Sequence, residues 1–259
     1  MLDMKQILKA YPQSLHVYGR SLLREYLQYK ILQAIFENKF SEKISFLGGT
    51  AIRIIHGNYR FSEDIDLDHF GLDWNAFEEV IFHVQRHLEL EGFKIEMRLI
   101  EKGAYHCMIR FPKILFDQGY SPFPHKKIAI RIDTFSQGYR YQPDIRIINK
   151  FDVFCEVRVT PLSILLSQKI FTSINRKRPK GRDFYDITYL MSMASPDFGF
   201  LKLKMGVDNE KELRTVYSKA ISNYDFKYLA DDVAPFLIDN RQLMRVLNFR
   251  QFWDQTPLQ

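Results

Sequence analysis

The spacing of apolar residues divides the chain into a mixed first part and a helical second part. Some segments carry apolar side chains at helical spacing, whereas shorter runs alternate apolar and polar side chains with the period of a half-buried strand. From Thr160 onward only the helical period remains. We predict strands over 44–47, 65–70, 93–100, 105–111, 126–135, 145–148 and 152–159, and helices over 21–36, 51–57, 75–90, 162–174, 184–194, 209–222 and 240–253.

The change of period near residue 160 predicts a domain boundary. Thr160 suits the N-cap of the helix that follows, and Pro161 suits its first helical position. We therefore expect an α+β fold with two domains. An N-terminal helix and a mixed-sheet core occupy 1–159, and a mostly helical domain occupies 160–259.

The composition is that of a globular protein. The hydrophobic fraction is 46% and the charged fraction is 26%, both ordinary values. No run approaches the roughly 18 apolar residues of a membrane-spanning helix, and the first residues do not resemble a secretory signal. The two cysteines, Cys107 and Cys155, lie in apolar strand-like runs, so we expect buried reduced thiols. These features favour a cytoplasmic protein without a membrane partner.

Positive charge is concentrated in one loop. The formal net charge is +6, and no acidic residue occurs between Glu156 and Asp183. The densest part reads RKRPKGR, in which Pro179 and Gly181 predict a loop. Such loops are often only solvated, but beside a catalytic site this one would bind the phosphates of a nucleic acid. The candidate RNA-binding residues are Arg176, Lys177, Arg178 and Lys180.

Two aspartates on one predicted strand are the first candidates for chemistry. Residues two apart on a strand point to the same face, so Asp64 and Asp66 project together. Two adjacent carboxylates repel each other, and a divalent cation removes that penalty. Oxygen ligands suit Mg²⁺. The alternative is a solvated strand face without a metal.

A glycine turn and a third aspartate extend the pattern. Gly48, Gly49 and Thr50 lie between a predicted strand and a helix, where backbone N–H groups can approach a phosphate. Asp133 lies in the strand IAIRIDTF and is the best third metal ligand, although it could instead pair with Arg131. Asp68 shares the parity of the first two aspartates but lies nearer the strand end, so we rank it lower. The histidines show no convergent metal-ligand spacing.

These motifs, read in order, resemble a known family. GGTAI, RFSEDIDL, the helix LLSQKIFTSINR with Lys169, and the helix start GRDFYDITYL together resemble the AbiEii/AbiGii toxins within the DNA polymerase β-type nucleotidyltransferases. The similarity covers roughly residues 44–192. It implies a mixed-sheet nucleotidyltransferase core followed by a helical domain that closes the active-site cleft.

The resemblance also implies a reaction and a set of roles. A nucleoside monophosphate would pass from an NTP to an acceptor, with tRNA the favoured acceptor and a cognate antitoxin as partner. We expect two Mg²⁺ ions. The predicted metal ligands are Asp64, Asp66 and Asp133; the catalytic set adds Lys169 and Asp186; and the nucleotide-binding set is Gly48, Gly49, Thr50, Ser62, Lys169 and Tyr185.

Some alternatives remain open at this stage. Lys169 lies on or beside the inward face of its helix, so it either enters a cleft or extends its ammonium to solvent. Asp183 lies in a first helical turn and could simply cap it, which makes Asp186 the better functional candidate of the two. The acceptor could be a small molecule such as an antibiotic, or the protein could be a basic RNA-binding module without catalysis.

Overall fold

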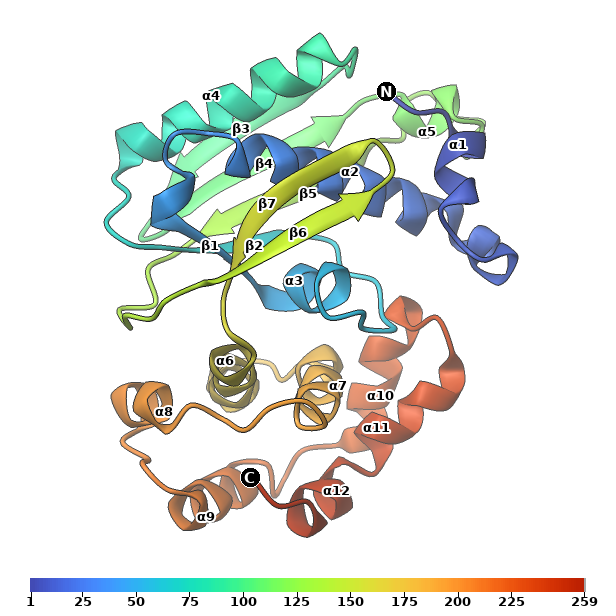
Figure 1. Ribbon diagram of the computed structural model, residues 1–259. Helices are drawn as coiled ribbons and strands as arrows, with labels where there is room; N and C mark the ends of the chain where they lie inside the picture. The colour runs from blue at the N-terminus through green and yellow to red at the C-terminus, as the bar shows by residue number, and fades with distance from the viewer. Residues whose placement is uncertain (259) are drawn as a thin grey trace. The chain divides into compact units, whose positions relative to one another are not determined.

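The chain folds into two compact units. The computed structural model describes residues 1–258 (Figure 1). The first unit comprises Met1–Gly57 and Ser62–Val159, and the second combines the short segment Asn58–Phe61 with the chain from Thr160 onward. In residues 1–258, no helix has both the length and the apolar character needed to cross a bilayer.

The first unit is built on one mixed sheet of seven strands. Their order is β3-β4-β5-β2-β1-β7-β6, with β2–β5 and β1–β7 parallel and the other neighbours antiparallel. The alternating sequence pattern buries one side of most strands, and Ile128, Ile130 and Ile132 of β5 are fully buried. The strands are β1 Ile44–Leu47, β2 Ile65–His69, β3 Glu96–Glu101, β4 Tyr105–Phe111, β5 Ile128–Thr134, β6 Asp144–Lys150 and β7 Val153–Val159.

Five helices accompany the sheet, and α2 and α4 are the longest. The helix α2 packs against β7 and α4, and both helices are visible beside the sheet in Figure 1. Asp73 caps α4 by accepting a hydrogen bond from the Ala76 N–H. The helices of this unit are α1 Met4–Lys9, α2 Gly19–Phe36, α3 Gly48–Ile54, α4 Trp74–Leu90 and α5 Ile114–Asp117.

A buried ion cluster ties α2 to α3 and β6. The carboxylate of Glu25 accepts hydrogen bonds from Arg53 (2.8 Å), Lys150 (3.0 Å) and the Tyr11 hydroxyl (2.8 Å). Burial opposes ionisation of Glu25, but the charges of Arg53 and Lys150 outweigh it and hold its pKa below the ordinary value. Each of these contacts joins separate elements, so the cluster fixes α3 against the rest of the unit.

The second unit is helical around an aromatic core. Phe184 lies 4.9 Å from Phe249, and Tyr217 lies 4.4 Å from Trp253, measured between ring centroids. Gly181 begins α7 where a β-carbon would lie 1.7 Å from the Leu229 carbonyl oxygen of α10, so only glycine permits this close approach. The helices are α6 Leu162–Asn175, α7 Gly181–Leu190, α8 Phe198–Met205, α9 Glu210–Ala220, α10 Phe226–Val233, α11 Met244–Leu247 and α12 Phe249–Gln255.

The elements differ from the sequence predictions in both units, and α1 and α5 of the first unit were not predicted. The helix expected over 240–253 is broken into a 3₁₀ turn, α11 and α12, and neither α8 nor α10 was predicted. Helix α6 starts at Leu162 rather than at Pro161, which takes the N-cap position instead of the first helical one. In the first unit, α3 starts at Gly48 and includes the glycines that we expected to precede it.

Candidate active site

Two aspartates face each other on adjacent parallel strands of the first unit. Asp66 of β2 is the register partner of Asp133 of β5. Asp64 lies directly before β2, two residues from Asp66. Side chains of register partners project from the same face of a sheet, so the structure brings together the three aspartates that the sequence singles out. Asp64 and Asp133 are partly exposed, with side-chain exposures of 32% and 22%.

A guanidinium and an imidazole contact these carboxylates. Arg131 donates from Nη2 to Asp64 (3.2 Å), and its Nε lies 2.8 Å from Asp133 Oδ2. His106 of β4 is the register partner of Asp133, and its Nδ1 lies 2.7 Å from Asp133 Oδ1. Pairing between Asp133 and Arg131 was the alternative to metal binding that the sequence left open, and it is present here. Arg131 therefore links two of the three predicted metal ligands.

The glycine turn supports the aspartates at close range. Gly48 has a φ of +79°, and a β-carbon there would lie 2.1 Å from Asp66 Oδ2. Thr50 is fully buried, and its hydroxyl donates a hydrogen bond to the Asp64 carbonyl oxygen. Gly49 is buried as well, and Ser62 is half-buried with its carbonyl accepting from Gln28 Nε2. In this arrangement the turn positions the carboxylates, and the Thr50 side chain offers no surface to a nucleotide.

The three aspartate carboxylates are chemically suitable ligands for a divalent cation. Gly48 leaves room at the Asp66 carboxylate that any other residue would fill, and carboxylate oxygens are the ligands that Mg²⁺ prefers. In residues 1–258, however, no group of three or more His, Cys, Asp or Glu side chains is already arranged to hold a metal ion. A metal would therefore have to compete with Arg131 for the carboxylates.

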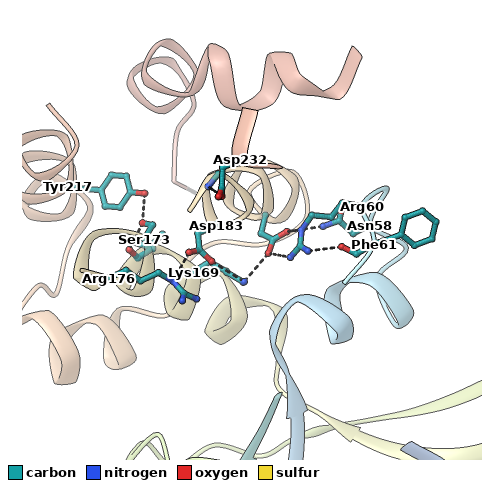
Figure 2. A network of polar contacts seen from close by, with 12 residues as sticks. Asn58, Arg60, Phe61, Lys169, Ser173, Arg176, Asp183, Tyr217 and Asp232 are labelled. Carbon is teal, nitrogen blue, oxygen red and sulfur yellow. Dashed lines mark hydrogen bonds and ion pairs between the residues drawn. The ribbon is translucent and has the colours of Figure 1, made fainter. Parts of the chain in front are cut away.

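The second unit contains a separate buried cluster of charges. Asp186 accepts hydrogen bonds from Arg60 Nε and Nη2 (both 2.6 Å) and from Asn58 Nδ2 (3.0 Å). The ammonium Nζ of Lys169 lies 2.9 Å from Asp186 Oδ2. Lys169 also donates to Asp183 (3.3 Å), as Figure 2 shows. Asp183 and Asp186 are fully buried, and Lys169 keeps 12% of its side chain exposed. The inward orientation predicted for Lys169 thus leads to an ion-pair cluster.

Electrostatics keep this cluster ionised. Burial alone would raise the pKa of Asp186, but the charges of Arg60 and Lys169 hold it below the ordinary value. Asp183 uses its carboxylate to pair with Lys169 and Arg176 rather than to cap α7. Tyr185 is fully buried, and burial raises the pKa of its phenol to about 12. Asp186 and Tyr185 have no exposed surface with which to contact a nucleotide in this arrangement.

The basic loop divides into paired and exposed charges. Arg176 pairs with Asp183 (2.9 Å), and Lys180 pairs with Asp232 (3.1 Å). Lys177 and Arg178 are exposed. Of the four predicted RNA-binding residues, these two are the most available to an external phosphate.

Several participants are absent from the sequence-based prediction. Asn58 and Arg60 precede the RFSEDIDL aspartates in sequence but belong to the second unit, where both bond Asp186. Arg60 is the first residue of the RFSEDIDL motif, but nothing in the local pattern indicates that it is buried and pairs with Asp186. For His106, the sequence shows only that it lies in an alternating strand. Its pairing with Asp133 could not be predicted, because it depends on the register between β4 and β5. Lys169 belongs to the second unit, whereas Asp64, Asp66 and Asp133 belong to the first.

Comparison with known proteins identifies the family. The sequence profile of the nucleotidyl transferase AbiEii toxins of type IV toxin–antitoxin systems matches residues 30–242. The chain belongs to this family. It is therefore a nucleotidyltransferase toxin, as the motifs implied, and membership implies an NTP substrate and a cognate antitoxin. Nucleotidyltransferases of this type generally use a divalent metal ion.

Solved structures support the same fold at low sequence identity. JHP933 from Helicobacter pylori has a TM-score of 0.57 and 14% identity, with 91% of this chain and 90% of that chain covered. MenT4, a nucleotidyltransferase toxin from Mycobacterium tuberculosis, has a TM-score of 0.58 and 13% identity, with coverages of 99% and 91%. No curated protein shows significant sequence similarity to the chain. The predicted α+β nucleotidyltransferase fold is thus confirmed.

Proposed function

We propose that this AbiEii-family toxin transfers a nucleoside monophosphate from an NTP to a hydroxyl group of tRNA, with release of pyrophosphate, in a Mg²⁺-dependent reaction. The observation that carries the proposal is the register pairing of Asp66 with Asp133, with Asp64 on the same face. In the proposal these three carboxylates hold two Mg²⁺ ions, which would stabilise the charge that develops on the phosphate oxygens. Asp133 also accepts the proton of the acceptor hydroxyl.

In the proposal, the remaining predicted residues supply backbone N–H groups, hold other residues in position or contribute charge. Gly48 and Gly49 place backbone N–H groups next to the aspartates, and Thr50 and Ser62 fix the segments that carry them. Lys169 contacts the NTP phosphates through its exposed part, and Asp186 positions it from the buried side. Tyr185, the neighbour of Asp186 in α7, holds that helix in place through its buried ring. Each of these roles is part of the proposal.

A labelled-transfer assay tests the reaction. Purified protein is incubated with total RNA, each of the four α-labelled NTPs and Mg²⁺, and the labelled RNA is resolved by size. We expect label in the tRNA fraction and none with Asp66→Asn or Asp133→Asn. Asp117→Asn, a change of an exposed aspartate in the same unit, is the matched control and should behave like wild type. Full activity of Asp66→Asn would refute the proposed metal site.

The exposed part of the basic loop supports tRNA as the acceptor. Lys177 and Arg178 carry two charges that an RNA backbone can neutralise. Each lost phosphate contact lowers the slope of log K against log salt concentration by roughly 0.7 to 0.9. The double variant Lys177→Gln/Arg178→Gln should therefore bind tRNA more weakly and with a flatter salt dependence. The double variant Lys211→Gln/Lys219→Gln removes two exposed lysine charges outside the loop, and it controls for the change in net charge alone.

The binding experiment also distinguishes the competing acceptors. If wild type binds tRNA equally well at low and high salt, tRNA is not the acceptor and a small-molecule acceptor becomes the better explanation. If tRNA binds but is never labelled with any NTP, the protein is an RNA-binding module without transfer activity.

A further inference from the structure

A pocket of ≈ 500 Å³ lies in the first unit at the end of β2, outside the roles assigned so far. One wall is formed by His69 and Phe70, and the other by the connection from β5 to β6, including Tyr139, Arg140 and Tyr141. Its volume falls within the range of small-ligand sites, roughly 300–1,000 Å³. Four rings and one guanidinium therefore surround a single hollow.

This lining has the chemistry that recognises a nucleobase. Unpaired bases stack on aromatic side chains and on arginine guanidinium groups, because each base presents a flat π-face. Partial burial lowers the pKa of His69, which favours the neutral imidazole, a ring that can stack without carrying a charge. Arg140 is exposed and could also meet a phosphate adjoining the base.

A single buried carboxylate holds both walls in place. Asp68 is 1% exposed and accepts hydrogen bonds from the His69 N–H (2.8 Å), the Gln137 N–H (2.9 Å) and the Tyr141 hydroxyl (2.9 Å). The rings of Phe70 and Tyr141 also meet edge to face, with centroids 5.1 Å apart. The pocket is thus preorganised, which reduces the conformational entropy lost on binding.

The register of the strands places the pocket relative to the aspartates. Leu47, which precedes the glycine turn, pairs with Asp66, whereas His69 pairs with Ile44 at the opposite end of β1. Asp66 and His69 are three residues apart on β2, a rise of roughly 10 Å. On the neighbouring strand, Asp133 lies one residue before the end of β5, from which the pocket loop continues. The pocket therefore lies at the end of β2 opposite the glycine turn, and His69, an odd number of residues from Asp66, points to the other face of the strand.

We propose that this pocket binds a nucleobase of the acceptor RNA at the end of β2 opposite the glycine turn. The proposal rests on the proposed function, in which Asp133 serves the acceptor and the glycine turn serves the NTP. Asp68 is then a positioning residue that holds the pocket walls. A base could in principle come from the NTP instead, and the test separates the two sources.

Binding in the absence of metal tests the pocket directly. Fluorescently labelled RNA trinucleotides and, separately, fluorescent NTPs are titrated with the full chain, and anisotropy reports the dissociation constants. Tyr139→Leu and Phe70→Leu remove a ring but keep apolar bulk. Each should weaken trinucleotide binding roughly tenfold, the effect of one base–aromatic stack. Tyr228→Leu, a change of an exposed tyrosine in the second unit, should leave it unchanged.

The binding results distinguish an acceptor base, an NTP base and the absence of a binding pocket. Weakened trinucleotide binding with unchanged NTP binding supports an acceptor base. Weakened NTP binding with unchanged trinucleotide binding overturns the acceptor assignment. Unchanged affinities in both ring variants, with melting temperatures near that of wild type, overturn the pocket altogether. If a ring variant is unfolded, Arg140→Gln provides the same comparison from an exposed position.

Failure of the pocket and failure of the proposed function look different. A protein that binds trinucleotides through these rings but labels no RNA with any NTP would refute the transfer reaction and leave the pocket standing. Normal labelling of tRNA by Tyr139→Leu and Phe70→Leu, with unchanged trinucleotide affinity, would refute the pocket alone.

Discussion

At the scale of single residues, Arg131 places one positive charge beside the carboxylate site. Its guanidinium contacts Asp64 and Asp133, so a divalent cation must displace it or share the carboxylates with it. Arg131→Gln removes one competing charge a few ångströms from the site. We expect Mn²⁺, used as a Mg²⁺ substitute, to bind roughly fivefold more tightly to this variant in isothermal titration calorimetry.

The control for this prediction is a second exposed arginine–aspartate pair. Arg241→Gln removes a cation beside Asp239 in the other unit and should leave Mn²⁺ binding as in wild type. Unchanged or weaker Mn²⁺ binding by Arg131→Gln would show that the arginine does not compete with a metal. Binding that survives Asp66→Asn would place the cation elsewhere.

At the scale of elements, the segment Asn58–Phe61 is joined to α7 by the pairing of Arg60 with Asp186. Arg60 is 1% exposed and Asp186 fully buried, so removing the charge of Asp186 leaves the Arg60 guanidinium without its paired carboxylate in a dry environment. Asp186 itself is also paired with Lys169. Asp186→Asn should reduce the free energy of unfolding by roughly 3–5 kcal/mol, because breaking a buried pair costs about that much. Urea unfolding followed by circular dichroism measures it.

A variant with both charges removed completes the test. Arg60→Met/Asp186→Leu replaces the pair with apolar groups, and it should be more stable than Asp186→Asn alone. If Asp186→Asn instead melts like wild type but loses transfer activity, then Asp186 acts in the reaction rather than in the fold.

At the scale of the whole molecule, each unit contains a buried carboxylate with a depressed pKa. Glu25 in the first unit and Asp186 in the second are both ionised against burial by adjacent cations. Their stabilising contributions are fully present above the ordinary pKa values of 4.5 and 3.8, and they are lost as the pH falls through the lower folded values. We therefore expect stability to be constant near neutral pH and to fall in acid.

The dependence on pH can be assigned to one unit at a time. Glu25→Gln should lower stability at pH 7 and flatten its acid dependence in unfolding measurements made between pH 7 and pH 3. Glu96→Gln, which changes a half-exposed carboxylate, should reproduce the wild-type profile. An unchanged acid slope in Glu25→Gln would mean that other groups govern acid unfolding.

Toxicity is a further property of the whole molecule. Induced expression of wild type should slow bacterial growth, since the chain belongs to a toxin family. Asp66→Asn should grow normally at equal protein abundance, measured by immunoblot, because it lacks the proposed metal ligand. Equal growth arrest by both proteins would separate toxicity from nucleotide transfer.

Local sequence determined most of the first unit and the identity of its aspartates. The strand over 105–111 begins and ends where alternation predicted, because each side chain's burial depends on a period of two that is visible in the sequence. The strand over 44–47, predicted as a short buried run, also has the expected bounds. The same parity placed Asp64 and Asp66 on one face. The family resemblance also followed from motifs that are contiguous in sequence.

Tertiary structure alone decided how charges are partnered. Arg131 reaches Asp64, His106 reaches Asp133, and Arg60 reaches Asp186 across separations of 67, 27 and 126 residues. No local pattern encodes such pairs, since they depend on strand register and on where distant segments meet. Burial of Asp186 and of Thr50 has the same origin. The sequence determined which groups can do chemistry, while packing decided which of them remain accessible to a ligand.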